Sequence, residues 1–175
     1  MTTYLLDSNI FIQAKNLHYG FDFCPAFWDW IDEAHGAGTV YSINAVRSEL
    51  VAGNDDLADW ARQRPSGFFV QPSAATVPSL QATSIWANSA GYAPAAVTTF
   101  LQVADYYLVA QARELACTVV IHEIVSSSMR RIKIPNACLG LSVQYVTPFT
   151  MLRAEKARFV LPRPLSPQPG LPDAA

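Results

Sequence analysis

The acidic residues Asp7 and Glu123 each follow an apolar stretch that is typical of a buried strand. Residues 3–7 are β-branched and aliphatic up to the acid, and residues 117–121 form the most hydrophobic predicted strand, just before His122 and Glu123. If both stretches belong to one parallel sheet, their carboxyl ends meet at the same edge, which is where α/β folds place ligands. We therefore expect the two carboxylates to lie together and to form part of a site.

The acidic residues Glu49 and Asp105 lie beside the apolar faces of predicted helices. Val46 and Leu50 share a buried helix face, and Glu49 is three residues after Val46 and so close to that face. Asp105 borders the apolar stripe of a long helical segment. If the chain bends near Gln102, Asp105 falls in the first turn of a second helix, where the helix dipole favours an anion.

The acids Asp7, Glu49, Asp105 and Glu123 would repel one another strongly at one sheet edge, and a cation would relieve that repulsion. Carboxylate oxygens are hard ligands, which suit Mg²⁺ or Mn²⁺. A centre of this kind can activate water and neutralise the charge of a phosphodiester. These residues therefore indicate metal-dependent phosphodiester hydrolysis.

The same acids also have simpler interpretations. Asp7 or Asn9 could only cap the following helix, because both residue types accept hydrogen bonds from unpaired backbone N–H groups. Glu49 could form a salt bridge with a neighbouring arginine. A phosphatase with Asp7 as its nucleophile, similar to haloacid-dehalogenase-like proteins, fits poorly. That family has a second Asp two residues after the first, and position 9 of this chain is Asn.

Strand-like and helix-like stretches alternate along the chain, which predicts an α/β fold: a three-layer α/β/α domain with a mainly parallel sheet. The predicted strands are residues 3–7, 39–43, 68–70, 117–121 and 143–146. The predicted helices are residues 25–36, 45–52, 55–62, 76–89, 95–114 and 148–157, with short helical segments at 10–15 and from Pro135. We expect one domain over residues 1–160 and a proline-rich, unstructured tail over residues 161–175.

Charge is distributed unevenly along the chain. Residues 1–123 contain 12 acidic and 5 basic residues, whereas residues 124–175 contain 2 acidic and 7 basic residues. An acidic body with a basic C-terminal third could hold a cation beside a polyanion. The basic residues Arg130, Arg131 and Lys133 are candidates for binding RNA phosphates, although such a run is also typical of a solvated surface.

The three cysteines are far apart and lack metal-ligand spacing, so we expect reduced core residues rather than a zinc site. The sequence has no signal-peptide pattern and no apolar run long enough to span a membrane. We therefore expect a cytoplasmic protein without a membrane partner.

The four acids occur in short motifs that resemble, in order, the signatures of PIN-domain ribonucleases. These motifs are Leu6-Asp7-Ser8-Asn9, Val46-x-x-Glu49-Leu50, Ala104-Asp105-x-x-Leu108-Val109-Ala110 and Val119-Val120-Ile121-His122-Glu123. Three longer segments, residues 21–30, 131–136 and 148–152, resemble more narrowly a bacterial PIN-like subfamily known as DUF4411. The resemblance spans roughly residues 3–160 and would make this a PIN-like nuclease domain.

The resemblance implies a five-stranded parallel sheet, an acidic Mg²⁺ or Mn²⁺ centre and cleavage of single-stranded RNA. It also implies the toxin half of a type II toxin–antitoxin pair, with an antitoxin protein as partner, and it leaves a homodimer open. Carried onto this chain, it makes Asp7, Glu49, Asp105 and Glu123 the catalytic and metal-site acids, with Ser8 and Asn9 supporting Asp7. The alternative is a catalytically weak PIN fold that binds RNA or a partner protein.

Overall fold

The structure, a computed structural model, describes residues 2–160 and contains a five-stranded sheet. The strands are β1 (Tyr4–Leu6), β2 (Val40–Ile43), β3 (Phe69–Val70), β4 (Thr118–Val120) and β5 (Tyr145–Val146). Every pairing is parallel, in the order β3-β2-β1-β4-β5. The predicted tail, residues 161–175, lies outside the described residues.

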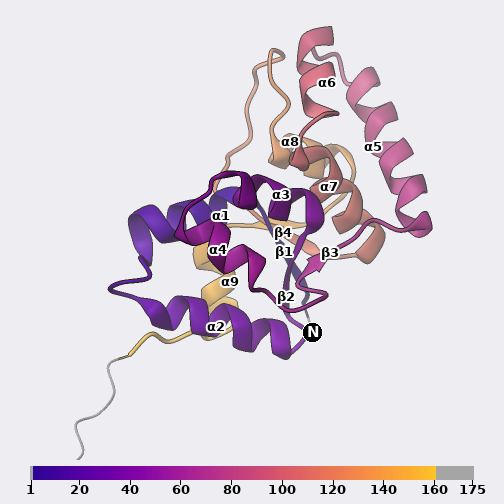
Figure 1. The fold of residues 1–175 in the computed structure, drawn as a ribbon. Coiled ribbons are helices and arrows are strands. Elements are labelled where there is room, and N and C mark those ends of the chain that lie inside the picture. The colour runs from indigo at the N-terminus through magenta and orange to yellow at the C-terminus, as the bar shows by residue number, and fades with distance from the viewer. Residues whose placement is uncertain (1, 161–175) are drawn as a thin grey trace, which may run out of the picture.

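Helices connect successive strands, as a parallel sheet requires. The α-helices of the described chain are α1 (Ser8–Gln13), α2 (Pro25–Gly36), α3 (Asn44–Ala52), α4 (Asp56–Arg62), α5 (Val77–Ser89), α6 (Pro94–Phe100), α7 (Ala104–Leu115), α8 (Ile134–Gly140) and α9 (Pro148–Ala154). A π-helical turn, η1 (Ala14–His18), continues α1, and a 3₁₀ turn, η2 (Ala74–Thr76), precedes α5. Helix α2 lies on one side of the strands and α3 and α7 lie on the other, so the chain forms the predicted three-layer α/β/α fold (Figure 1).

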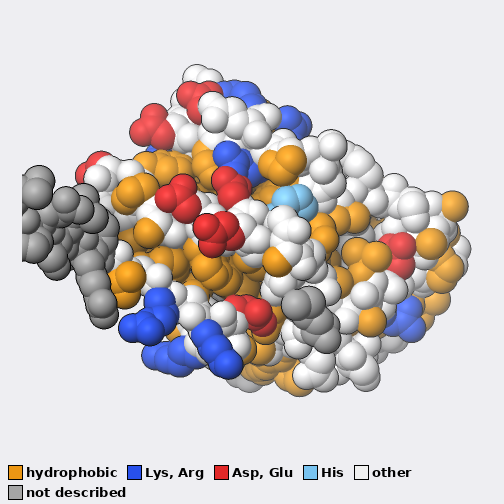
Figure 2. All heavy atoms as spheres, turned by 90° about the horizontal axis from the view of Figure 1, so that it is seen from below, with side chains coloured by type: hydrophobic (Ala, Val, Ile, Leu, Met, Phe, Trp, Pro, Cys, Tyr) orange, Lys and Arg blue, Asp and Glu red, His pale blue; other side chains and the backbone are white. Residues whose placement is uncertain are grey.

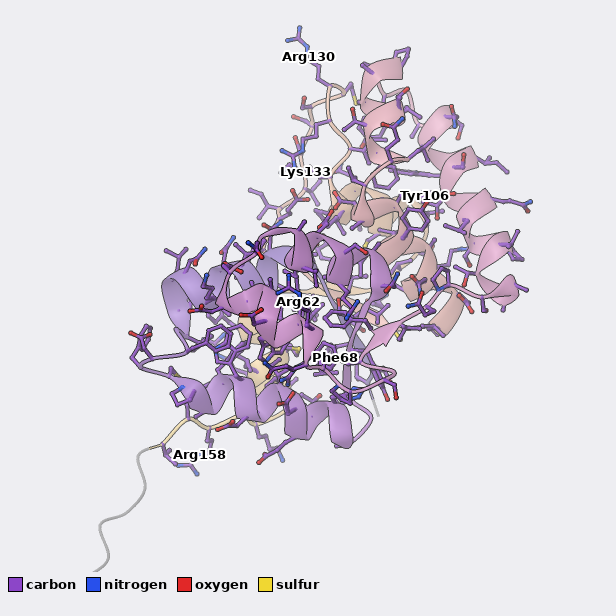
Figure 3. All side chains as sticks on the ribbon, in the orientation of Figure 1. Arg62, Phe68, Tyr106, Arg130, Lys133 and Arg158 are labelled. Atoms are coloured by element: carbon purple, nitrogen blue, oxygen red, sulfur yellow. The ribbon has the colours of Figure 1, made fainter. Side chains whose placement is uncertain are left out.

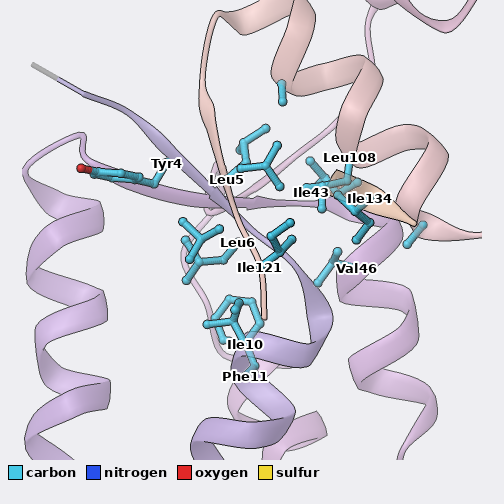
Figure 4. Close-up of a cluster of buried hydrophobic side chains, with 14 of the residues drawn as sticks. Tyr4, Leu5, Leu6, Ile10, Phe11, Ile43, Val46, Leu108, Ile121 and Ile134 are labelled. Atoms are coloured by element: carbon cyan, nitrogen blue, oxygen red, sulfur yellow. The ribbon is translucent and has the colours of Figure 1, made fainter. Parts of the chain in front are cut away.

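Side chains of β1 alternate between the two helical layers. Leu5 points toward the layer that holds Val46 and Leu108, whereas Tyr4 and Leu6 point the other way (Figure 4). Leu5 and Leu6 are fully buried, at 0% exposure. Burial on both faces explains why the strand is a continuous apolar run, and it explains why Asp7, the first polar residue after it, marks the strand's end.

Strand positions agree with the sequence prediction, although each strand is shorter by one or two residues. The helical segment predicted over residues 95–114 is two helices, with the bend near Gln102 that the sequence left open, because α6 ends at Phe100 and α7 begins at Ala104. Val103 has an extended backbone there (φ −110°, ψ 169°). Asp105 consequently lies in the first turn of a new helix. The π-helical turn was missed, because the helical segment predicted there covers only residues 10–15.

The acidic residues of α2, Asp29, Asp32 and Glu33, are exposed, as the helical pattern predicts for a solvated face. Figure 2 views the molecule from the side on which α2 lies and shows acidic side chains standing among apolar ones. None of the helices within residues 2–160 is long and apolar enough to cross a membrane.

Candidate functional site

A pocket of about 540 Å³ lies at the carboxyl edge of the sheet. It is bounded by the beginnings of α1 and α7, by α3, by α6 and by the segment before α8. Its lining residues are Ser8, Asn9, Glu49, Ala95, Ala96, Thr99, Phe100, Val103, Asp105, Arg130, Arg131 and Ile132. Acidic and basic side chains therefore share one pocket, although they are far apart in the sequence.

Asp7 is buried, at 2% exposure, and does not itself line the pocket, although the next two residues, Ser8 and Asn9, do. Its Oδ2 accepts hydrogen bonds from the backbone N–H (3.3 Å) and the side-chain Nδ2 (3.2 Å) of Asn9, and its Oδ1 lies 3.4 Å from the Ser8 hydroxyl, which donates to it. Asp7 is thus the N-cap of α1, as the simpler interpretation held. Burial nevertheless raises the pKa of Asp7 to about 6, although the hydrogen bonds from Ser8 and Asn9 lower it.

Asp105 is the acid on which the charges of the pocket act most strongly. Burial raises the pKa of Asp105 to about 7, and the negative charges of Asp7, Glu123 and Glu49 add to the increase. Arg131 opposes the increase. The fold thus brings all four predicted acids within electrostatic reach of one carboxyl group, which a carboxylate tolerates poorly without a compensating cation.

Glu49 lies on the wall of the pocket, in α3. Its side chain is exposed, although the spacing from Val46 predicted a position near the buried face. The salt bridge to an arginine that was the simpler interpretation of Glu49 is absent from the described residues. Its carboxylate is therefore available to a ligand in the pocket.

Glu123, unlike the other acids, is already neutralised by neighbouring cations. Its Oε1 lies 2.6 Å from Lys133 Nζ and 3.7 Å from an Arg131 guanidinium nitrogen. Its Oε2 accepts a hydrogen bond from the backbone N–H of Ile134 at 3.1 Å. Glu123 also does not line the pocket.

The predicted basic residues divide into two groups. Arg130 and Arg131 line the pocket from a segment that we call the arginine loop, residues 124–133. Arg130 stands at the outer tip of this loop and points away from the molecule, while Lys133 lies nearer the body of the molecule (Figure 3). Lys133 pairs with Glu123 and does not line the pocket, whereas both arginines do. Arg131 is 70% exposed and only 3.7 Å from Glu123, so it can still meet an anion at the pocket.

The carboxylates of the pocket fit a hard divalent cation by their chemistry, because they are oxygen donors whose charges repel one another. Their spacing is looser than that of a closed metal cage. Across residues 2–160, no group of three or more His, Cys, Asp or Glu side chains is spaced to hold a metal ion. Any cation held here would be bound through only part of this acid set, with water completing its coordination.

Part of the pocket has no signature in the sequence. Helix α6 supplies one wall through Ala95, Ala96 and Thr99, which are small residues without chemical function. The spacing of small residues along α6 could have indicated a helix face without bulky side chains. It could not have shown that Arg130 and Arg131 lie across the pocket from that face. The pairing of Lys133 with Glu123 was also missed, because the nine residues between them form irregular chain.

The raised pKa values predict how the stability of the metal-free protein depends on pH. Asp7 and Asp105 bind a proton more tightly in the folded protein than in the unfolded chain, where their pKa is near 3.8. The free energy of unfolding should therefore fall as the pH rises from about 4 to about 8, by about 3 kcal/mol for Asp7 alone. Urea unfolding in EDTA at both ends of this interval measures the change.

The control for this measurement is Asp7→Asn, which keeps the helix cap but removes the titrating group. This variant should lose less stability than the parent over the same interval. Glu114→Gln, at the far end of α7 from Asp105, should behave like the parent. Equal pH dependence of Asp7→Asn and the parent would contradict the assigned burial cost of Asp7.

Comparison with known proteins gives a family for this chain. A search of curated proteins and of solved structures found no match. The profile of the family DUF4411, described as a domain of unknown function, matches residues 4–159. This range begins at β1, ends after α9 and includes every pocket residue. The chain belongs to the DUF4411 family.

Proposed function

We propose that this protein is a metal-dependent endoribonuclease that hydrolyses phosphodiester bonds of single-stranded RNA. One observation carries the proposal: burial and three other acids raise the pKa of Asp105 at a pocket whose rim carries Arg130 and Arg131. Carboxylates crowded together suit a divalent cation, and arginines beside them suit the phosphates of a substrate. The resemblance to PIN-domain ribonucleases supports the same activity.

In this proposal Asp7, Glu49 and Asp105 hold Mg²⁺ or Mn²⁺, and Glu123 is the fourth acid of the set. When bound, such a cation would supply an activated water and would neutralise negative charge on the phosphate. Ser8 and Asn9 orient Asp7 through their hydrogen bonds to its two oxygens.

The positive side of the pocket binds the substrate. Arg130 and Arg131 meet RNA phosphates at the pocket mouth and direct one phosphodiester toward the carboxylates. The pocket is open to solvent on this side, since Arg131 is 70% exposed. The preference for a single strand follows the resemblance to PIN-domain ribonucleases.

We further propose a biological role as the toxin of a type II toxin–antitoxin pair acting in the cytoplasm. This role follows the resemblance to PIN-domain toxins, and the three unpaired cysteines suit a reducing compartment. A small DNA-binding protein encoded by the adjacent reading frame would support it. Relief of RNA cleavage when that protein is added would test it.

Metal binding provides a first test of the proposed function. A cation present at a concentration of about 100 times its dissociation constant should raise the melting temperature of the protein by about 5–10 °C, because it binds the folded protein and not the unfolded chain. Thermal melts with EDTA or with millimolar Mn²⁺ measure the shift. They are run at pH 8, which lies above the raised pKa values of Asp7 (about 6) and Asp105 (about 7), so both side chains are ionised. Asp7→Asn and Asp105→Asn should each reduce the shift, whereas Glu114→Gln should keep it.

The alternative function, a catalytically weak module that binds RNA or a partner protein, makes a different prediction for the same melts. Such a module needs the arginines but not the cation. An unchanged melting temperature with Mn²⁺, together with RNA binding that persists in EDTA, would favour the binding module over the nuclease.

A further inference from the structure

The arginine loop is closed at its base by one side chain, that of Glu123. This residue directly precedes the loop, and it binds Lys133, the last loop residue, at 2.6 Å. Its second oxygen accepts the backbone N–H of Ile134, the first residue of α8, at 3.1 Å. The carboxylate therefore joins the two ends of the loop to each other. The side chains of Glu123 and Lys133 are 15% and 27% exposed, so water only partly screens this pair.

Additional hydrogen bonds hold the arginine loop along its length. The side chain of Asn136, in α8, donates to the backbone oxygen of Ser126 at 2.8 Å and accepts from its N–H at 3.0 Å. The N–H of Ala93, just before α6, donates to the carbonyl of Met129 at 2.9 Å. The arginine loop thus runs beside α6, and these hydrogen bonds hold its backbone in place (Figure 1).

This arrangement determines where the two arginines lie. Arg130 directly follows the Met129 contact with Ala93, and Arg131 precedes the Lys133 anchor by two residues. Arg131 is itself 3.7 Å from Glu123. Releasing Glu123 would free one end of the loop and let both arginines move away from the carboxylates.

We propose that Glu123 is a positioning residue that fixes the arginine loop across the pocket, and that Asp7, Glu49 and Asp105 bind the cation without it. The part about the cation rests on the proposed function, whereas the part about the loop does not. Both oxygens of Glu123 are already bonded within the protein. A metal ligand at this position would have to give up Lys133 and Ile134, and the loop would lose its base.

Two substitutions separate the two roles of Glu123. Glu123→Gln removes the charge that holds Lys133. Lys133→Met removes the lysine partner and leaves the Glu123 carboxylate with only Arg131 and the Ile134 N–H. If Glu123 is an anchor, both variants loosen the loop and neither changes cation binding. If Glu123 is a ligand that Lys133 restrains, Lys133→Met should tighten cation binding and Glu123→Gln should weaken it.

The experiment combines three measurements on the parent, both variants, their double variant and Glu114→Gln as a matched control. Amide hydrogen exchange in EDTA should accelerate about fivefold or more in residues 124–133 of each single variant, and the double variant should add little, because the pair acts as one unit. Titration with Mn²⁺ should give dissociation constants within about twofold of the parent. The affinity of each single variant for a short single-stranded RNA, measured in EDTA, should be about tenfold weaker than that of the parent.

Two results would overturn the proposal. One is a loss of Mn²⁺ affinity of about tenfold or more in Glu123→Gln, or a gain in Lys133→Met. The other is unchanged loop exchange in both variants. A parent protein that binds no Mn²⁺ would refute the proposed function instead, and the exchange measurement would still decide whether Glu123 anchors the loop.

Discussion

Replacing Asp105 by Asn should abolish RNA cleavage while leaving the metal-free protein at least as stable as the parent. Asp105 lies in the first turn of α7, and burial together with three neighbouring acids raises its pKa to about 7. An ionised Asp105 at higher pH is therefore costly to the fold. Asn has nearly the same shape without the charge, so the substitution removes a repulsion and a cation ligand together.

The expected loss of cleavage is about a thousandfold or more in single-turnover rate, because the lost carboxylate contributes to holding the cation in the transition state. A labelled RNA incubated with parent or Asp105→Asn protein in Mn²⁺ measures this rate. Urea unfolding in EDTA at about pH 8 measures the stability of both. Glu114→Gln should match the parent in both measurements. Cleavage that survives in Asp105→Asn, or a clear loss of metal-free stability, would remove Asp105 from the proposed centre.

Replacing Arg130 and Arg131 together by Ala should weaken RNA binding and reduce its dependence on salt. Each arginine that neutralises a phosphate on a single strand contributes about 0.7 to the slope of log affinity against log salt. The double variant should therefore lose about 1.4 from that slope and about tenfold or more in affinity at moderate salt. Fluorescence anisotropy with a short labelled RNA, measured in EDTA over a range of salt concentrations, gives both quantities.

The matched control removes two arginines elsewhere on the protein, Arg62 and Arg158. Both lie away from the arginine loop, and Arg158 stands at the opposite end of the molecule from Arg130 (Figure 3). This control changes the net charge by the same amount, so it isolates the effect of position. Equal loss of affinity in the two double variants would show that the arginines of the loop act only through overall charge.

The sequence predicted the sheet and the acidic edge because both follow from local patterns. Buried parallel strands are short apolar runs, and the polar residue after each run marks its carboxyl end, as Asp7 does after β1. The first-turn position of Asp105 followed from a bend that the chain makes between α6 and α7. These features depend on a few neighbouring residues and were therefore visible in the sequence.

The remainder of the site depends on contacts between distant segments. The exposure of Glu49 was mispredicted. Its spacing from Val46 shows which side of the helix it lies on, but not which other segments of the chain cover that side. The engagement of Glu123 by Lys133 depends on how the arginine loop folds back, which no periodic pattern records. The small residues of α6 became a pocket wall only because the loop lies opposite them.

The central claim, hydrolysis by a carboxylate-held cation, is tested most directly by the ends of the RNA products. Of the described residues that line the pocket, none is a histidine that could use the ribose 2′-hydroxyl as a nucleophile. Cleavage should therefore leave 5′-phosphate and 3′-hydroxyl ends, proceed on an RNA with a 2′-deoxy residue at the cut position, and stop in EDTA. Cyclic-phosphate ends, or cleavage that continues in EDTA, would contradict this account.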